Sequence, residues 1–206
     1  MRSSSNRYSR AIFLEQTAKF YVLRQKLYFL HLIEIIIMLQ SGDTVPNFRQ
    51  QSSQGKIDFY DWAGDSWIVF FSYPVDCTSI CTAELGSVAK LKPEFDKRGV
   101  KVIALSVKNQ ECQQDLIDEI DEAQDTTVNY PVVADADKSV SALYDIINSE
   151  ANGKVIVRTV FVIDPQKKLR LTISDPPNMG GDLEINTQRN FQDVLRTIDS
   201  LQSSEN

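Results

Sequence analysis

Apolar and polar positions alternate along residues 43–206 in a pattern that predicts buried strands separated by helices. The runs "SWIVFFSYP" (66–74) and "VKVIALSV" (100–107) are apolar throughout and have the length of buried strands. The residues between these two runs carry apolar side chains at helical spacing: Leu85, Val88, Leu91 and Phe95. Gly99 follows them as a natural helix stop. The pattern therefore predicts a strand, a helix and a second strand.

The rest of the chain continues this alternation. An acidic amphipathic helix is marked by Leu116, Ile117, Ile120 and Ala123. "YPVVADA" is typical of a short strand and "SVSALYDII" of a helix, while "VRTVFVID" and "KLRLTIS" flank "PQKK" as in a hairpin. A closing helix covers roughly 190–201. The order predicts an α/β protein with a thioredoxin-like fold, a central mixed sheet flanked by helices.

Residues 1–37 differ from the remainder, 38–206, which we interpret as the thioredoxin-like domain. The first segment carries six basic and two acidic side chains, net +4, so the remainder is net −10. It contains no uncharged apolar run of the roughly 18–20 residues that a membrane span needs. We interpret residues 1–37 as an N-terminal extension, either a transit peptide for an organelle or codons upstream of a true start at Met38.

Composition excludes several classes of function. An acidic body without a basic stripe argues against nucleic acid or a membrane surface as the main partner. Three cysteines are too few for a secreted disulfide scaffold, which favours a reducing compartment such as the cytoplasm. The only histidine, His31, lies in the N-terminal segment. The domain therefore cannot build a Ser–His–Asp triad, a Cys–His pair or a histidine-ligated metal site.

Two thiols, Cys77 and Cys81, lie between the first predicted strand and the following helix. Thr78 or Ser79 can cap that helix, which places Cys81 in its first turn. Free N–H groups and the helix dipole favour an anion there, so a thiol pKa of about 8.5 can fall to roughly 3.5–7.5. The alternative is that Cys81 is a small buried hydrophobe, the usual state of a free cysteine. For Cys112, on a polar helix face, we favour that structural interpretation.

The residues around Cys81 resemble the peroxiredoxin family. In "YPVDCTSICTAELGSVAKLKPEF" the signature Pro-x-x-x-Thr-x-x-Cys is matched by Pro74, Thr78 and Cys81. "VRTVFVIDPQKKLRL" is similar to the strand that carries an active-site arginine in this family, here Arg158. "LQSGDTVPNF" resembles the start of these enzymes, and "VNYPVVADADKSVSALYDII" and "RNFQDVLRTIDSLQ" are similar to its 1-Cys subfamily. The resemblance covers about 39–202.

This resemblance implies a thiol peroxidase acting on hydrogen peroxide and alkyl hydroperoxides. Cys81 is the expected peroxidatic thiolate, which attacks one peroxide oxygen and becomes a sulfenic acid. Arg158 is expected to lower the thiol pKa and to stabilise charge along the breaking O–O bond. Thr78 is expected to orient the peroxide, and Pro74 to shield the sulfenate from water.

The resemblance also assigns supporting residues and partners. Glu84 is expected to hold the arginine, and Arg189 matches a second arginine of the 1-Cys pocket. No cofactor and no metal are implied. The sulfenic acid is expected to be returned to the thiol by an external thiol reductant such as glutathione or the thioredoxin system, and the protein to form a homodimer.

The sequence departs from the family pattern at several positions. Tyr73 replaces a histidine, Cys77 an aromatic residue, and the pair Ser79–Ile80 a Pro-Val pair. The stretch 175–188 before the second arginine is longer than in the family. The family continues beyond the position of Asn206 into an arm that helps to form the dimer, so we expect a weaker or different dimer.

Some relatives carry a phospholipase site with a serine, a histidine and an aspartate. Here "GDSWI" keeps Ser66, but Tyr60 and Gln166 occupy the other two positions. A serine without a base is a poor nucleophile, so we expect no phospholipase activity.

Three other interpretations compete with the peroxidase. The Cys-x-x-x-Cys pair suits Cu(I), as in a copper metallochaperone, although the histidine that this class needs is absent from the domain. A catalytically weakened relative acting as a redox sensor or chaperone is the second. The third concerns Arg158 alone, because an arginine on a strand is usually a surface or ion-paired residue.

Overall fold

The computed structural model describes residues 39–73, 79–150, 153–174 and 189–204. The chain separates into two compact units, Met1–Met38 and Leu39–Asn206, and every described residue belongs to the second. The expected extension 1–37 lies outside the described residues, as do Pro74, Cys77 and Thr78.

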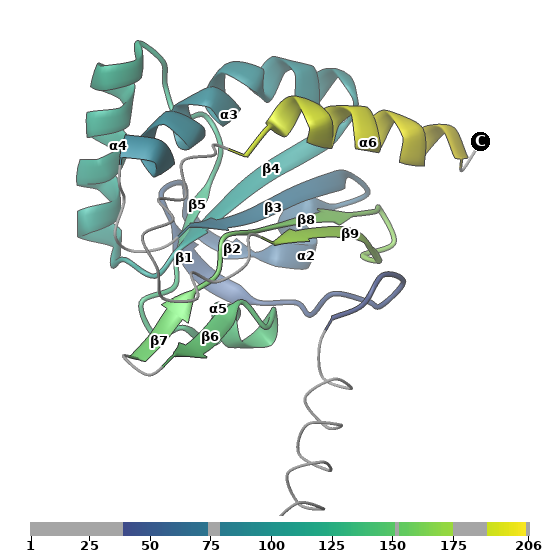
Figure 1. The fold of residues 1–206 in the computed structure, drawn as a ribbon, viewed down its shortest axis with the longest axis horizontal. Coiled ribbons are helices and arrows are strands. Elements are labelled where there is room, and N and C mark those ends of the chain that lie inside the picture. The colour runs from purple at the N-terminus through teal and green to yellow at the C-terminus, as the bar shows by residue number, and fades with distance from the viewer. Residues whose placement is uncertain (1–38, 74–78, 151–152, 175–188, 205–206) are drawn as a thin grey trace, which may run out of the picture. The chain divides into compact units, whose positions relative to one another are not determined.

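A seven-stranded mixed sheet forms the centre of the described unit, in the order β2-β1-β5-β4-β3-β8-β9 (Figure 1). Its strands are β1 (Arg49–Ser52), β2 (Gly55–Asp58), β3 (Trp67–Tyr73), β4 (Val100–Ser106), β5 (Val132–Ala134), β8 (Thr159–Ile163) and β9 (Leu169–Ser174). β3, β4 and β5 run parallel, whereas β8 runs antiparallel to β3 and to β9. A separate hairpin consists of β6 (Ile147–Glu150) and β7 (Gly153–Ile156).

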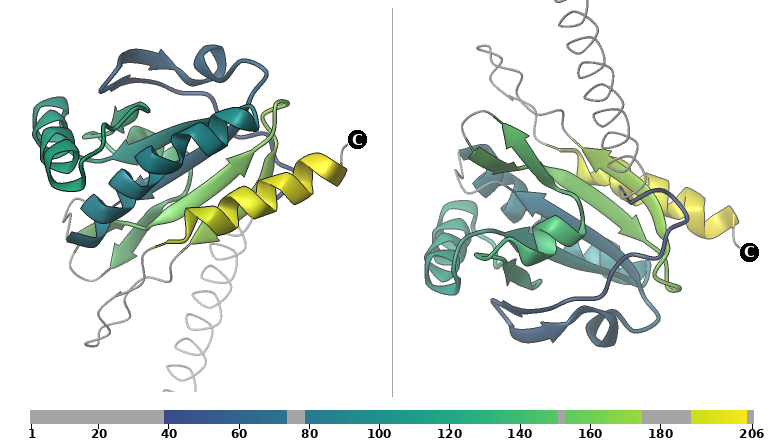
Figure 2. Two further views of the ribbon diagram at one scale, coloured as in Figure 1. Left: turned by 90° about the horizontal axis from the view of Figure 1, so that it is seen from above. Right: turned by 90° about the horizontal axis from the view of Figure 1, so that it is seen from below.

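Helices cover both faces of this sheet. They are α2 (Phe59–Ala63), α3 (Ser79–Lys97), α4 (Gln110–Gln124), α5 (Ser139–Leu143) and α6 (Phe191–Ser204). α3 and α6 lie side by side on one face, and α2 and α5 lie on the other (Figures 1 and 2). The mixed sheet flanked by helices confirms the architecture that the alternating sequence pattern predicts.

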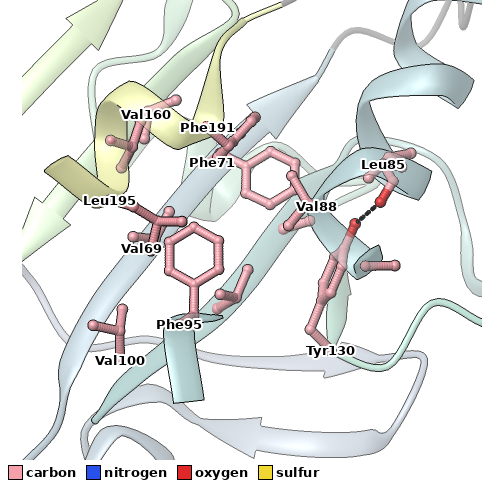
Figure 3. Packing of buried hydrophobic residues seen from close by; sticks show 14 of the residues in the cluster. Val69, Phe71, Leu85, Val88, Phe95, Val100, Tyr130, Val160, Phe191 and Leu195 are labelled. Atoms are coloured by element: carbon pink, nitrogen blue, oxygen red, sulfur yellow. Dashed lines mark hydrogen bonds between the residues drawn. The ribbon is translucent and has the colours of Figure 1, made fainter. Parts of the chain in front are cut away.

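β3 divides the hydrophobic core into two clusters because successive strand residues face opposite sides. All seven of its residues are buried. Phe71 packs with the α3 and α6 residues Leu85, Val88, Phe191 and Leu195 (Figure 3). Phe70 belongs to the second cluster, on the side of α2 and α5. Because β3 is packed on both faces, the residues at its end are held in fixed positions.

Several elements differ from the sequence prediction. The helix predicted over "SVSALYDII" ends at Leu143, because Asp145 adopts a left-handed backbone with φ 52° and Ile147 starts β6. The pairs β1–β2 and β6–β7 and the short helix α2 are absent from the prediction. β1 and β2 read "RQQS" and "GKID", which lack the apolar alternation that marks a strand.

The fold brings the end of β3 close to the start of β8 and to the helices α3 and α6. β3 pairs with β8 in antiparallel register, with Phe71 opposite Val160, so the end of β3 lies beside the start of β8. α3 follows β3 in the chain, and α6 packs against α3. Residues just after β3 and just before β8 and α6 are therefore the candidates for a shared site.

Packing of α6 onto the sheet is expected to contribute strongly to stability. Ile198 is fully buried in the hydrophobic cluster that α3 and α6 form with the sheet. Ile198→Ala is therefore expected to lower the free energy of unfolding by about 2–5 kcal/mol. The control Gln192→Ala changes an exposed residue of the same helix and is expected to have little effect. Urea unfolding checks both, and equal losses would contradict this packing.

Candidate active site

A buried carboxylate, that of Glu84, is the centre of a three-residue charged cluster. Glu84 is 1% exposed and lies in the second turn of α3. Its Oε1 accepts hydrogen bonds from Arg158 Nη2 at 3.1 Å and from Arg189 Nε at 2.7 Å. Its Oε2 accepts from Arg189 Nη2 at 2.7 Å, and the backbone N–H of Arg189 donates to Oε1 at 3.2 Å. One carboxylate therefore binds two guanidinium groups.

The two arginines come from different elements. Arg158 immediately precedes β8, and Arg189 stands two residues before α6. Their side chains are 7% and 6% exposed, so both charges are buried. The contact between Glu84 and an arginine that the resemblance implies is present, and it includes Arg189 despite the long stretch 175–188 before it.

Arg189 has further partners that fix its guanidinium. Its Nη2 donates a hydrogen bond of 3.0 Å to the backbone carbonyl of Ser72, at the end of β3. Its Cζ lies 5.6 Å from the ring centroid of Phe71 and 5.8 Å from that of Phe191, within the range of a cation–π contact. The group is thus held by a carboxylate, a carbonyl and two aromatic faces.

The three side chains of this cluster together carry a net positive charge, because among the described residues the two guanidinium groups share the carboxylate of Glu84. Nη1 of Arg189 is buried and has no hydrogen-bond partner among the described residues. The N-terminus of α3 adds its own partial positive charge nearby. Together these groups favour an anion at the first turn of the helix.

Cys81 is the third residue of α3, one turn before Glu84. The prediction that Cys81 falls in the first helical turn is therefore confirmed. Its side chain lies outside the described residues, as do Pro74 and Thr78, so the roles assigned to these three residues stay predictions.

Tyr130 is a site neighbour that the sequence analysis did not identify. Its hydroxyl donates a 2.8 Å hydrogen bond to the carbonyl of Leu85, the residue after Glu84 (Figure 3). Burial raises the pKa of Tyr130 well above its usual value, and the neighbouring Tyr73 and Glu84 add to this, so Tyr130 stays a donor. Nothing in the strand-like string "YPVVADA" indicates this contact.

The remaining sequence candidates do not assemble a second site. Tyr60 donates its hydroxyl hydrogen to the carbonyl of Val45 at 2.5 Å, and Gln166 is exposed in the turn between β8 and β9. Neither side chain can serve Ser66 as a base. Within the described ranges, no group of three His, Cys, Asp or Glu side chains could hold a metal ion, and no helix is long and apolar enough to cross a membrane.

Comparison with known proteins shows the family of the chain. Residues 41–172, more than half of the chain, match the AhpC/TSA family. The chain belongs to this family. A 1-Cys peroxiredoxin of Dictyostelium discoideum is 44% identical to this chain over 81% of this chain and 66% of its own length. The mitochondrial peroxiredoxin PRX1 of Saccharomyces cerevisiae is 43% identical over 81% and 64%.

Solved structures of peroxiredoxins confirm the thioredoxin-like α/β fold. Peroxiredoxin 6 of Arenicola marina superposes with a TM-score of 0.70 at 37% identity, covering 80% of this chain and 74% of that one. A yeast mitochondrial 1-Cys peroxiredoxin gives 0.71 at 41% identity, covering 82% and 78%. The chain spans about two thirds of the length of the two curated relatives above.

Removing the shared carboxylate is expected to destabilise the fold. Glu84→Ala leaves two buried guanidinium groups without this counter-charge, so the free energy of unfolding should fall by about 3–5 kcal/mol. The matched control is Glu94→Ala on the same helix, whose partners Lys97 and Arg98 are solvent-accessible, and it should change little. Chemical denaturation of both variants checks this, and a small loss for Glu84→Ala would contradict it.

Proposed function

We propose that this protein is a thiol-dependent peroxidase with a 1-Cys mechanism, which reduces hydrogen peroxide and organic hydroperoxides. The observation that carries the proposal is the buried cluster of Glu84, Arg158 and Arg189 one helical turn after Cys81. A thiol has to lose its proton before it can attack a peroxide. Two buried guanidinium groups and a helix N-terminus supply the charge that favours this loss, without the histidine that the domain lacks.

The chemistry balances without a cofactor. The Cys81 thiolate attacks the nearer oxygen of the peroxide, an S–O bond forms and the O–O bond breaks. The other oxygen leaves with the electron pair, takes up a proton and departs as water or an alcohol, while Cys81 becomes a sulfenic acid. Arg158 stabilises the charge on the breaking bond. Thr78 orients the peroxide, and Pro74 limits the access of water.

Return of the sulfenic acid to the thiol completes the proposed cycle. An external thiol attacks the sulfenic sulfur and releases water, and a second thiol then reduces the mixed disulfide. In the yeast mitochondrial 1-Cys peroxiredoxin, the thiol is resolved via the glutathione and thioredoxin systems. We propose the same class of reductant here, a homodimer as the working form, and the cytoplasm as the site of action, with organelle import if residues 1–37 are a transit peptide.

The weakened redox sensor is the competing function, and Tyr73 is the observation that favours it. This residue replaces the family histidine and is 1% exposed. It is the last residue of β3 and follows Ser72, whose carbonyl binds Arg189 of the charged cluster. A buried phenol cannot exchange a proton near neutral pH as an imidazole can. The two functions differ in the rate at which Cys81 reacts with peroxide.

The rate of Cys81 oxidation tests the proposal. We expect the second-order rate constant with hydrogen peroxide to exceed that of free cysteine by several orders of magnitude, and Cys81→Ser to abolish the reaction. Arg158→Met should lower the rate constant by about 10²–10³, as for the loss of one transition-state donor. Stopped-flow fluorescence with the purified full chain measures all three.

Two controls make this test specific. Arg170→Met removes a partly exposed arginine paired with Asp164, and its guanidinium lies by Trp67 at the opposite end of β3. Cys112→Ser removes a thiol that the mechanism does not use. Both variants should keep the rate of the unaltered protein. A wild-type rate near that of free cysteine would favour the sensor instead.

A further inference from the structure

The hydroxyl of Ser72 makes two hydrogen bonds across the sheet at the point where β3 and β8 separate. Ser72 is 1% exposed. Its Oγ donates to the carbonyl of Val157 at 2.7 Å and accepts from the backbone N–H of Thr159 at 3.1 Å. Its own carbonyl accepts the 3.0 Å hydrogen bond from Arg189 Nη2. Ser72 therefore contacts both chain segments that carry the buried arginines.

The two hydroxyl contacts fall on either side of Arg158. The last residue pair of the β3–β8 register is Phe71 opposite Val160, and β8 begins at Thr159. The backbone pairing of β3 with β8 thus ends at Val160, two residues after Arg158. From there the Ser72 side chain takes the place of the main chain as the partner of β8.

This arrangement fixes the backbone of Arg158. The carbonyl of Val157 belongs to the peptide plane before Arg158, and the N–H of Thr159 belongs to the plane after it. The φ and ψ angles of a residue are the rotations that relate these two planes. A single oxygen bonded to both planes therefore restricts both angles, and with them the direction of the side chain toward Glu84.

We propose that Ser72 is a positioning residue that aims the Arg158 guanidinium at the Cys81 end of α3, and that its carbonyl does the same for Arg189. The proposal rests on the peroxidase function inferred above. It predicts that loss of the hydroxyl acts on the reactivity of Cys81 through Arg158. A purely structural hydroxyl would instead change the stability of the sheet and leave that reactivity unchanged.

The chain offers a closely matched control in Ser52. This serine is fully buried at the end of β1, on the far side of β5 and β4 from β3. Its Oγ donates to the carbonyl of Gly55 at 2.7 Å and accepts from the backbone N–H of Gln54 at 3.1 Å. Ser52→Ala and Ser72→Ala therefore each remove one hydroxyl of a buried serine, together with one hydrogen bond to a carbonyl and one from a backbone N–H.

The test compares these two variants by the rate constant for hydrogen peroxide and by thermal unfolding of the full chain. Both should lose stability, but only Ser72→Ala should lower the rate constant, by about tenfold, because it alone frees the peptide planes on either side of Arg158. Ser72→Thr keeps the hydroxyl and should recover most of that rate. Equal rates in Ser72→Ala and in the unaltered protein would overturn the proposal.

A double-mutant cycle with Arg158→Met shows whether Ser72 acts through the arginine. In the Arg158→Met background, Ser72→Ala should cause little further loss, and a full tenfold further loss would overturn the proposal. If the unaltered protein proves no faster than free cysteine, the peroxidase function fails but the positioning is still measurable. The pH midpoint of Cys81 alkylation should then rise in Ser72→Ala and not in Ser52→Ala, and an unchanged midpoint would reject the role.

Discussion

Three segments that are far apart in the sequence meet at the carboxylate of Glu84. Arg158 lies 74 positions and Arg189 105 positions after it in the chain, yet both bind it in the interior. Burial of charges costs desolvation free energy, so such a cluster is weak evidence for stability in itself. Its consequence is geometric: the carboxylate joins α3 to the start of β8 and to the segment just before α6.

This arrangement supplies the positive charge that a thiol needs in a domain without histidine. A thiol without a histidine needs positive charge from elsewhere, and the only histidine of the chain is outside the domain. The cluster supplies more positive than negative charge, and it does so beside the N-terminal turn of α3, where Cys81 stands. The buried rings of Phe71 and Phe191 hold the Arg189 guanidinium in place, and Tyr130 ties the same helical segment to the core. The site is therefore built into the packing of the sheet against α3 and α6.

The strands β3 and β4, the β8–β9 hairpin and the helix α6 were predictable because their apolar residues follow a clear period. The family resemblance indicated Arg158 as a catalytic residue and Glu84 and Arg189 as supporting residues. Other features left no trace in the sequence. β1 and β2 form a local hairpin of mostly polar residues, in which the turn at Gly55 and the Arg49–Asp58 ion pair replace the apolar alternation. The string "SVSALYDII" is apolar enough for a helix, although a left-handed residue ends it. Ser72 sits in an otherwise apolar run, where one hydroxyl gives no sign that it bridges two peptide planes 85 and 87 positions away.

The central claim is that this charged cluster keeps the Cys81 sulfur ionised at neutral pH. The most direct measurement is the pH dependence of Cys81 alkylation in the unaltered full chain, with mass spectrometry separating Cys81 from Cys77 and Cys112. The account predicts a midpoint well below the thiol pKa of about 8.5 that a free cysteine shows. A midpoint at or above that value would show that the guanidinium groups do not act on the sulfur, and would contradict the account.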